Sequence, residues 1–225
     1  MVCRICQGLT EVVGEKRGQL ARRTFVLRRC RRCQFAFVEE PWLDYAAIYD
    51  SAYYEGRGAD PLVDYHFELA EPRRTIRRFE WAGIVEVVRR LTVLDSRTRW
   101  LDFGCGNGGL VRHCQSNVGC VAMGYEQGAI VPAARAAGIA ILEPSELAPL
   151  EGSCDVVTAI EVLEHVFDPL ATLNQIRRLL RPGGVFFYTT GNALPFRDKL
   201  VSWSYFIPEI HISLYEPASL EHALQ

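Results

Sequence analysis

Cysteines near the N-terminus form two C-x-x-C pairs, "CRIC" and "CRRC", separated by 23 residues. They are Cys3, Cys6, Cys30 and Cys33. Four thiolates at this spacing can converge tetrahedrally on Zn²⁺. They leave no coordination position for water or substrate, so we predict a structural zinc site in a piece of chain too small to build its own core. A thioredoxin-like redox pair is the alternative. It is disfavoured because two pairs occur and no βαβ pattern surrounds them.

A glycine-rich stretch, "LDFGCGNGG", runs from Leu101 to Gly109 after a short apolar segment. Gly104 would allow a sharp exit from a strand, and Gly106 would let a ligand approach the backbone closely. An ordinary strand-to-helix turn can show the same glycines. About 20 residues after the loop, however, a second predicted strand ends at Glu126, where an acid can accept both hydroxyls of a ribose. The spacing therefore indicates a nucleotide-type cofactor.

Histidines supply the candidate bases. His165 lies in "LEHV", just after a predicted strand, and His211 lies in "PEIHISLYEPASL", after the last predicted strand. Ligands bind beyond the carboxyl ends of strands in open α/β sheets, so either imidazole could meet a substrate. A packing role for His165 and a solvated loop position for His211 remain alternatives. The other histidines are His66, His113 and His222, and the last two look structural.

The elements that must position these residues alternate from residue 98 onward. Apolar strand patterns are expected at 99–104, 120–126, 139–142, 154–163 and 184–191, with helical patterns at 109–115, 129–138 and 168–180. Asp168 is placed to cap the last helix. This alternation predicts an α/β fold with a doubly wound, mainly parallel sheet.

The preceding residues differ in character. Residues 1–40 are expected to form a zinc-binding ribbon with strands at 24–30 and 35–41. Residues 41–97 are rich in aromatic side chains and predict helices at 45–56 and 64–91, interrupted near Pro72, as a lid or linker. Residues 98–225 then form the cofactor-binding core. Tyr53 and Tyr54 would either cover the cofactor or pack as ordinary core aromatics.

Four spaced pieces resemble the class I S-adenosylmethionine-dependent methyltransferases. They are "LDFGCGNGG", Glu126 at the end of the second strand, "CDVVTAIEVLEHVFDP" and "LRPGGVFFYTT", which occur in this order. A nicotinamide enzyme shows G-x-G-x-x-G more often, and Gly109 satisfies that spacing as well. The later "LEH" and "RPGG" pieces favour the methyltransferases.

The resemblance implies a role for each matching residue. Asp102 would lie near the amino-acid moiety of S-adenosylmethionine, and Glu126 would hold the ribose hydroxyls. Glu161 would face the methionine end. The backbone around the loop, the residue after the ribose acid and the segment "EPSEL" beside the adenine add further candidates: Gly104, Cys105, Gly106, Gln127, Ser145 and Glu146.

The resemblance also bears on the substrate. The region of His211 is similar to that of small-molecule O- and C-methyltransferases of ubiquinone-pathway and sugar-modifying types, in which a histidine lies near the substrate. Zinc-bearing methyltransferases of nucleotide-linked deoxysugars show the same order of zinc knuckles, aromatic helical segment and core. Transfer from a sulfonium needs alignment and, for a poor nucleophile, a base such as His211 or His165. We therefore expect a small-molecule substrate, which could be a nucleotide-linked sugar or another natural-product intermediate and could be anionic.

Charge keeps other functions open. Residues 1–34 hold nine Lys/Arg against two Glu, a net +7 in a chain of net −2. Such a ribbon could contact phosphates, so an RNA methyltransferase is one alternative. A non-catalytic zinc scaffold with a vestigial cofactor fold is another. Transfer of a methyl group to any component of an extract would exclude the scaffold.

Bulk properties suit a globular protein. The chain has 225 residues and 49% hydrophobic residues, enough for a core. It has no long apolar run and no signal-peptide pattern, so we expect a cytoplasmic protein whose remaining cysteines pack. The family's core usually ends in an antiparallel hairpin, whereas this sequence ends in the helical pattern "PASLEHALQ". Either the chain is truncated or the sheet has five parallel strands, whose exposed edge could favour a homodimer.

Overall fold

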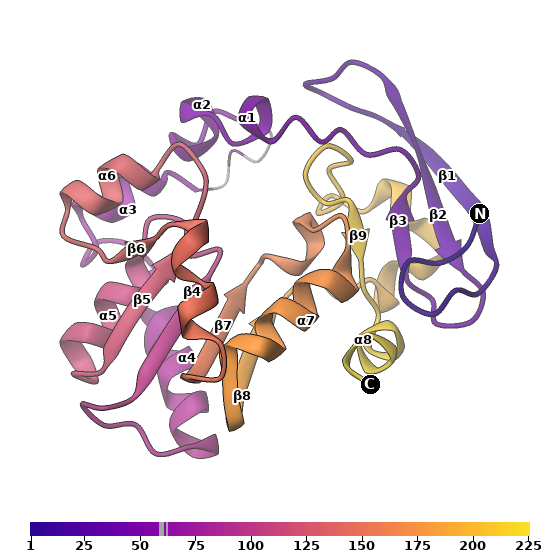
Figure 1. The fold of residues 1–225 in the computed structure, drawn as a ribbon. Helices are drawn as coiled ribbons and strands as arrows, with labels where there is room; N and C mark the ends of the chain where they lie inside the picture. The colour runs from indigo at the N-terminus through magenta and orange to yellow at the C-terminus, as the bar shows by residue number, and fades with distance from the viewer. Residues whose placement is uncertain (59–60, 62) are drawn as a thin grey trace. The chain divides into compact units, whose positions relative to one another are not determined.

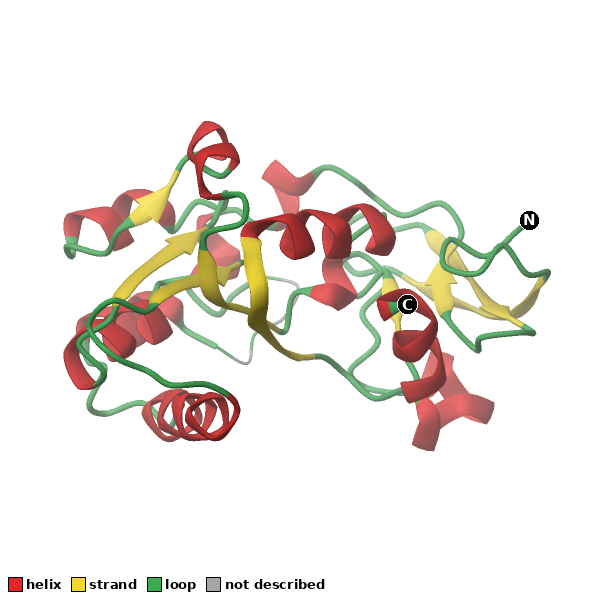
Figure 2. Cartoon of the chain, turned by 60° about the horizontal axis from the view of Figure 1, so that its bottom comes forward, coloured by secondary structure: helices red, strands yellow, loops and turns green. Residues whose placement is uncertain are grey.

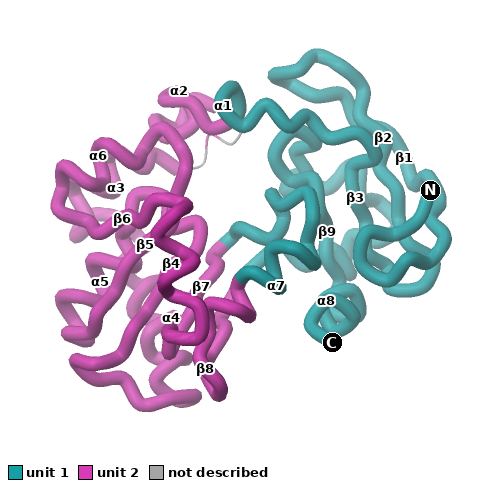
Figure 3. Tube along the Cα trace, viewed as in Figure 1, with its two compact units in different colours: residues 1–48, 161–175, 189–225 teal, residues 49–160, 176–188 magenta. Residues whose placement is uncertain are grey.

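The computed structural model describes residues 1–58, 61 and 63–225. The chain forms two compact units (Figure 3). Unit 1 comprises residues 1–48, 161–175 and 189–225, and unit 2 comprises residues 49–160 and 176–188. Each unit is built from segments that are distant in the sequence. The units cut across the predicted stretches 1–40, 41–97 and 98–225.

Unit 2 is organised around a five-stranded sheet of order β6-β5-β4-β7-β8 (Figure 1). The strands are β4 (Arg99–Phe103), β5 (Val121–Tyr125), β6 (Ile141–Leu142), β7 (Cys154–Ile160) and β8 (Leu180–Thr189), whose last residue belongs to unit 1. Parallel pairing joins β4 to β5, β4 to β7 and β5 to β6. This is the predicted doubly wound, mainly parallel α/β fold.

Helices lie on both sides of this sheet (Figure 2). They are α2 (Ser51–Tyr54), α3 (Tyr65–Ala70), α4 (Arg77–Leu91), α5 (Gly109–Asn117) and α6 (Val131–Ala136), with short 3₁₀ turns η1 (Pro144–Glu146) and η2 (Ala148–Leu150). The core includes Trp100, Val111, Cys114, Ala122 and Val156. The buried side chains alternate along the strands and recur every three or four residues along the helices. This periodicity allowed the elements to be predicted from the sequence.

Unit 1 contains a four-stranded antiparallel sheet of order β1-β2-β3-β9. Its strands are β1 (Thr10–Arg17), β2 (Thr24–Cys30), β3 (Ala36–Val38) and β9 (Ser213–Leu214). The last strand comes from the C-terminal part of the chain, so the ribbon is completed by residues far away in sequence. Its core contains Phe25, Leu27, Phe206, Ile212 and Leu214.

The remainder of unit 1 is short helical structure: α1 (Tyr45–Ile48), η3 (Leu163–His165), η4 (Leu194–Ser202) and α8 (Pro217–Leu224). Helix α7 (Pro169–Leu179) begins in unit 1 and ends in unit 2. Asp168 caps it as predicted, because its Oδ1 accepts the N–H of Ala171 at 3.0 Å. Among the described residues, no helix is both long and apolar enough to cross a membrane.

Several expectations about local structure need correction. Strand β1 was not predicted, because its residues lack a clear alternation of apolar and polar side chains. The helix expected at 45–56 is two short helices, because Asp50 caps a new one by accepting the N–H of Tyr53. In α4 the apolar residues are not all core: Ile84 and Val88 are buried, whereas Phe79 is exposed.

Candidate active site and metal centre

The glycine loop of unit 2 connects β4 to α5 through three residues with left-handed backbone. Gly104, Gly106 and Gly108 have φ of 74°, 54° and 73°, a region that side chains with a Cβ rarely adopt. The N–H groups of Gly104 and Cys105 donate to the carbonyl of Tyr125 at 2.8 and 3.1 Å. The loop is therefore fixed against the end of the neighbouring strand.

Glu126 follows β5 and is the acid that the sequence assigns to a ribose. Its Oε2 accepts the N–H of Gly106 at 3.0 Å, and its Oε1 accepts those of Gln127 and Gly128 at 2.8 Å each. A carboxylate has about four lone-pair sites, so these three bonds orient the group and leave capacity for a further donor. The structure thus brings together the glycine loop and Glu126, which the sequence spacing assigns to one cofactor site.

Asp102 is buried in β4, with a side chain that meets β7. Its Oδ1 accepts the hydroxyl of Thr158 at 2.7 Å, and the Thr158 oxygen in turn accepts Trp100 Nε1–H at 3.1 Å. Burial, with a smaller contribution from the charge of Glu126, raises the pKa of Asp102 to about 7. Burial thus favours the neutral form of the carboxyl group. A nearby cation, such as an ammonium group, would stabilise its ionised form.

A group of aromatic and polar side chains from α2 and α3 packs against the loop. The ring of Tyr65 would contact a Cβ added at Gly106, and the hydroxyl of Tyr54 leaves no room for one at Gly128. Asn107 accepts the Gly109 N–H at 2.9 Å and donates to the Tyr65 carbonyl at 3.1 Å. The two tyrosines explain why a residue without a Cβ occupies position 106 in the loop and position 128 after Glu126.

The other predicted cofactor residues are less constrained. Ser145 and Glu146 lie exposed in η1, where Glu146 Oε2 accepts the N–H of Glu143 at 2.7 Å. The Gln127 side chain is exposed, and the Cys105 thiol is buried against Gly124. Burial raises the pKa of Cys105 well above its usual value, so this residue is present as the thiol.

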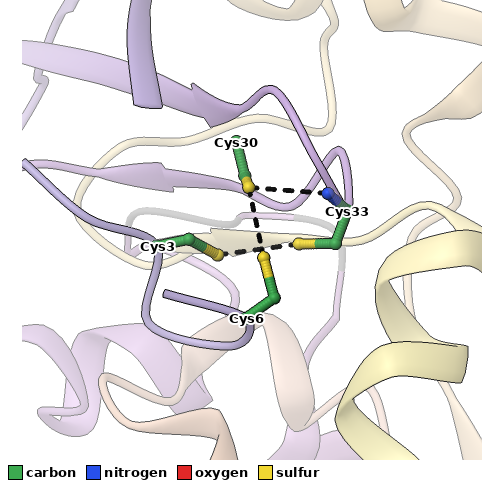
Figure 4. Close-up of side chains that lie close together, drawn as sticks. All are labelled: Cys3, Cys6, Cys30 and Cys33. Atoms are coloured by element: carbon green, nitrogen blue, oxygen red, sulfur yellow. Dashed lines mark hydrogen bonds between the residues drawn. The ribbon is translucent and has the colours of Figure 1, made fainter. Parts of the chain in front are cut away.

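The four N-terminal cysteines gather in unit 1 as predicted (Figure 4). Their sulfur atoms all lie within 4.8 Å of one another. Cys3 and Cys33 are 3.6 Å apart at Sγ, and Cys6 and Cys30 are 3.4 Å apart. Tetrahedral Zn–S bonds of about 2.3 Å place sulfur atoms about 3.8 Å apart, so the cluster fits a zinc ion.

The two cysteine pairs share one local geometry. The Gln after each pair has a left-handed backbone, with φ of 58° at Gln7 and 64° at Gln34. Its N–H donates to the carbonyl of the first cysteine, at 3.1 Å in both cases. Backbone N–H groups also point at the sulfurs: Ile5 N lies 3.3 Å from Cys3 Sγ, and Arg32 N lies 3.3 Å from Cys30 Sγ. Such N–H groups stabilise thiolates around a cation.

The histidines His165 and His211 meet in unit 1, with ring centroids 5.0 Å apart. His165 Nδ1 lies 2.9 Å from the Ile210 carbonyl, and His211 Nδ1 hydrogen-bonds to the Tyr205 carbonyl. A carbonyl can only accept, so Nδ1 carries the hydrogen in both rings and Nε2 carries the lone pair. Burial lowers the pKa of His165 to about 4 and that of His211 to about 3.

Unit 1 also gathers residues that the sequence did not single out. The Tyr205 hydroxyl lies 2.5 Å from Glu164 Oε1 and 2.9 Å from Glu161 Oε2. Tyr205 lies 44 positions beyond Glu161 and 41 beyond Glu164, and no short motif connects them. Glu164 is part of the motif "LEH", but no feature of the sequence predicts that its carboxyl group is buried. Glu161, predicted at the cofactor, belongs to this cluster in unit 1.

Comparison with known proteins gives the family. Residues 74–225 match the family described as "Methyltransferase domain". The chain belongs to this family. The match covers more than half of the sequence and includes the glycine loop, Glu126 and both clustered histidines. The predicted class I S-adenosylmethionine-dependent methyltransferase is thereby confirmed as a family and as a fold.

Curated methyltransferases include similar sequences. A ubiquinone biosynthesis O-methyltransferase of Xanthomonas oryzae pv. oryzae is 32% identical over 144 residues, covering 60% of this chain and 59% of the relative. The chain thus spans about three fifths of the length of that methyltransferase.

Solved methyltransferase structures share the fold. Phosphoethanolamine N-methyltransferase 2 of Haemonchus contortus, solved with S-adenosyl-L-methionine, has a TM-score of 0.57 and 17% identity, covering 84% of this chain and 45% of that chain. A SAM-dependent methyltransferase of Archaeoglobus fulgidus has a TM-score of 0.51 and 17% identity, covering 72% of each chain.

Proposed function

We propose that the protein transfers a methyl group from S-adenosylmethionine to a hydroxyl group of a small molecule. The observation that carries this proposal is the fixed pairing of the glycine loop with Glu126 in a chain of the methyltransferase domain family. Its similarity to ubiquinone biosynthesis O-methyltransferases supports oxygen as the acceptor and a small molecule as the substrate.

The residues of unit 2 fit the cofactor. Gly106 has no Cβ, Glu126 has remaining acceptor capacity for ribose hydroxyls, and buried Asp102 can face an ammonium group. Gln127, Ser145 and Glu146 would flank the nucleoside. When bound, the cofactor supplies a methyl group made electrophilic by its sulfonium. The chain's residues then supply alignment rather than a covalent nucleophile.

His211 and His165 are the proposed catalytic residues on the acceptor side. Both are neutral at physiological pH because burial lowers their pKa, and in each the Nδ1 bond to a carbonyl fixes the ring and its tautomer. A neutral imidazole can accept a hydrogen bond from an acceptor hydroxyl at Nε2 and so orient the oxygen for in-line attack.

The cysteine cluster is proposed to bind one structural Zn²⁺ ion. Four thiolates fill a tetrahedral shell, so the ion would stabilise the fold of the ribbon and take no part in methyl transfer. Strand β3, directly after the second knuckle, pairs with β9, and the N–H of Val38 donates to the Ile212 carbonyl at 3.0 Å. The metal would therefore help to hold the segment that carries His211.

Several arginines of the ribbon already have partners. Arg28 pairs with Glu39 at 2.9 Å, and Arg31 pairs with Glu11 at 2.9 Å. Arg4 packs on Phe37 with 4.5 Å from its guanidinium carbon to the ring centroid. The two ion pairs offset part of the positive charge of the ribbon and favour a small substrate over RNA. Eight unpaired cysteines support a reducing compartment such as the cytoplasm.

The test is product analysis with S-adenosylmethionine that carries a deuterated methyl group. The protein is incubated with a small-molecule extract or with RNA, and labelled products are identified by mass spectrometry. We expect label in a small molecule, strongly reduced in His211→Ala and retained in the control His222→Ala, whose histidine lies in α8 near the chain end. Label in RNA alone would replace this function by the RNA methyltransferase alternative.

A further inference from the structure

Asn107 lies inside the glycine loop of unit 2, and its side chain uses both its nitrogen and its oxygen. Its Nδ2 donates to the Tyr65 carbonyl at 3.1 Å and to Glu68 Oε2 at 3.3 Å. Its Oδ1 accepts the N–H of Gly109 at 2.9 Å. An amide has two donor hydrogens on nitrogen and an acceptor on oxygen, so these partners fix which way the group points. The loop is thereby joined to α3 by two hydrogen bonds and to α5 by one.

Glu68 is the buried acid of α3, and three other side chains compensate its charge. Its Oε1 accepts the hydroxyl of Thr75 at 3.0 Å and lies 3.8 Å from Arg77 Nε, while its Oε2 accepts the Asn107 amide. Thr75 and Asn107 are buried as well. A carboxylate taken out of water is tolerated only where hydrogen bonds and an opposite charge compensate it. Here the compensation comes from the glycine loop and from the start of α4.

These hydrogen bonds give the contact between α3 and the loop a defined geometry. An apolar contact tolerates sliding, whereas a hydrogen bond weakens steeply away from its preferred distance and angle. Glu68 and Asn107 meet from segments 39 positions apart, and Asn107 also bonds to the first residue of α5. All the bonds are therefore made at one placement of α3 against the loop.

The placement of α3 determines what lies beside the cofactor loop. The ring of Tyr65, the first residue of α3, would lie 3.0 Å from a Cβ added at Gly106. Its centroid is 6.0 Å from that of Tyr53 and 5.3 Å from that of Tyr54, so it continues an aromatic group. The N–H of Gly106 in turn donates to Glu126, the acid proposed for the ribose. A displacement of α3 would thus shift both the aromatic ring and the loop that orients this acid.

We propose that Glu68 and Asn107 are positioning residues for the cofactor: their hydrogen bond holds α3 against the glycine loop in the arrangement that binds S-adenosylmethionine. This inference rests on the proposed function. The two side chains act through Tyr65, Gly106 and the orientation of Glu126. A loop that is ordered before the ligand arrives reduces the ordering cost of binding. All of these residues belong to unit 2, so the inference depends on one compact unit alone.

An exchange of donor and acceptor tests the hydrogen bond itself. Asn107→Asp replaces both donors by a carboxylate oxygen that faces the Tyr65 carbonyl and the Glu68 carboxylate, and both repel it. We expect the Kd for S-adenosylhomocysteine, measured by calorimetric titration, to rise about 10-fold. In the double variant Glu68→Gln/Asn107→Asp, the new amide on α3 can donate to the new carboxylate in the loop, so the Kd should return to within about 3-fold of wild type. The matched control Asn117→Asp makes the same change at an exposed residue of α5 and should keep the wild-type affinity.

Thermal unfolding of each variant separates this role from a loss of folding. If Asn107→Asp does not fold, Asn107→Ala takes its place, since it breaks the same bonds without adding a charge. A raised Kd with a retained unfolding transition is then the expected result. Wild-type affinity in the folded Asn107 variant, or an equal loss of affinity in Asn107→Asp and in the double variant, would overturn the inference. Absence of S-adenosylhomocysteine binding by the wild type would instead contradict the proposed function, and this inference with it.

Discussion

The candidate residues of the two units are assembled in opposite ways. In unit 2 the loop and its acid lie within residues 102–128 and are held by backbone hydrogen bonds. In unit 1 the cysteine cluster, the histidines and the carboxyl pair come from three distant segments, joined by pairing of β3 with β9. The first site therefore depends on local backbone geometry, and the second depends on tethers between remote parts of the chain.

Loss of the metal should have the largest effect, and this effect should be confined to unit 1. Cys30→Ser removes one thiolate at the end of β2, and structural zinc contributes on the order of 10 kcal/mol to small metal-bound folds. We expect loss of the bound metal and of the unfolding transition of unit 1, with S-adenosylhomocysteine binding by unit 2 retained. Metal analysis, calorimetry and titration measure these effects. Cys154→Ala, which alters a buried thiol in unit 2, should keep the metal.

A second test concerns the buried acid of unit 2. Folding raises the pKa of Asp102 from 3.8 to about 7. Between these pH values, the folded protein keeps the proton on Asp102, whereas the unfolded chain has lost it. Stability should therefore fall as pH rises from about 4 to about 7, by about 4 kcal/mol in total. Denaturant titrations of Asp102→Asn should lack this slope. An unchanged slope would show that Asp102 is not the titrating group.

The cofactor affinity should depend on Glu126. Glu126→Ala removes the acceptor of three backbone N–H groups and the proposed acceptor of the ribose hydroxyls, and hydrogen bonds to a charged group contribute about 1.5–3 kcal/mol each. We expect the Kd for S-adenosylhomocysteine, measured by calorimetric titration, to rise at least 10-fold. Glu143→Ala, at an exposed acid in the same unit, should keep the wild-type affinity.

The smallest effect should come from one added methyl group in the loop. Gly106→Ala places a Cβ at 3.0 Å from the Tyr65 ring in a left-handed backbone, whereas Gly152→Ala meets open space at a similar φ of 69°. Strain of this backbone costs about 1–2 kcal/mol in both variants. Only Gly106→Ala should also weaken cofactor binding. Equal cofactor affinity of the two variants would mean that the cofactor does not lie against Gly106.

The same contrast explains how much the sequence could predict. The loop, Glu126 and the parallel sheet follow from local spacing and apolar periodicity, and the four cysteines follow from ligand chemistry. The pairing of β9 with β3 and the contact of Tyr205 with Glu164 could not be predicted, because they join residues far apart in sequence. The family resemblance predicts that Glu161 faces the methionine end of the cofactor. Its contact with Tyr205 instead depends on that long-range packing.

Direct titration of the wild-type protein with cofactors tests the central claim. S-adenosylmethionine and a nicotinamide dinucleotide are titrated separately into the metal-loaded protein by calorimetry, since both ligands have a ribose that Glu126 could hold. Saturable one-to-one binding of S-adenosylmethionine, with no binding of the dinucleotide, is the predicted result. Binding of the dinucleotide alone, or of neither ligand, would contradict a methyltransferase site in unit 2.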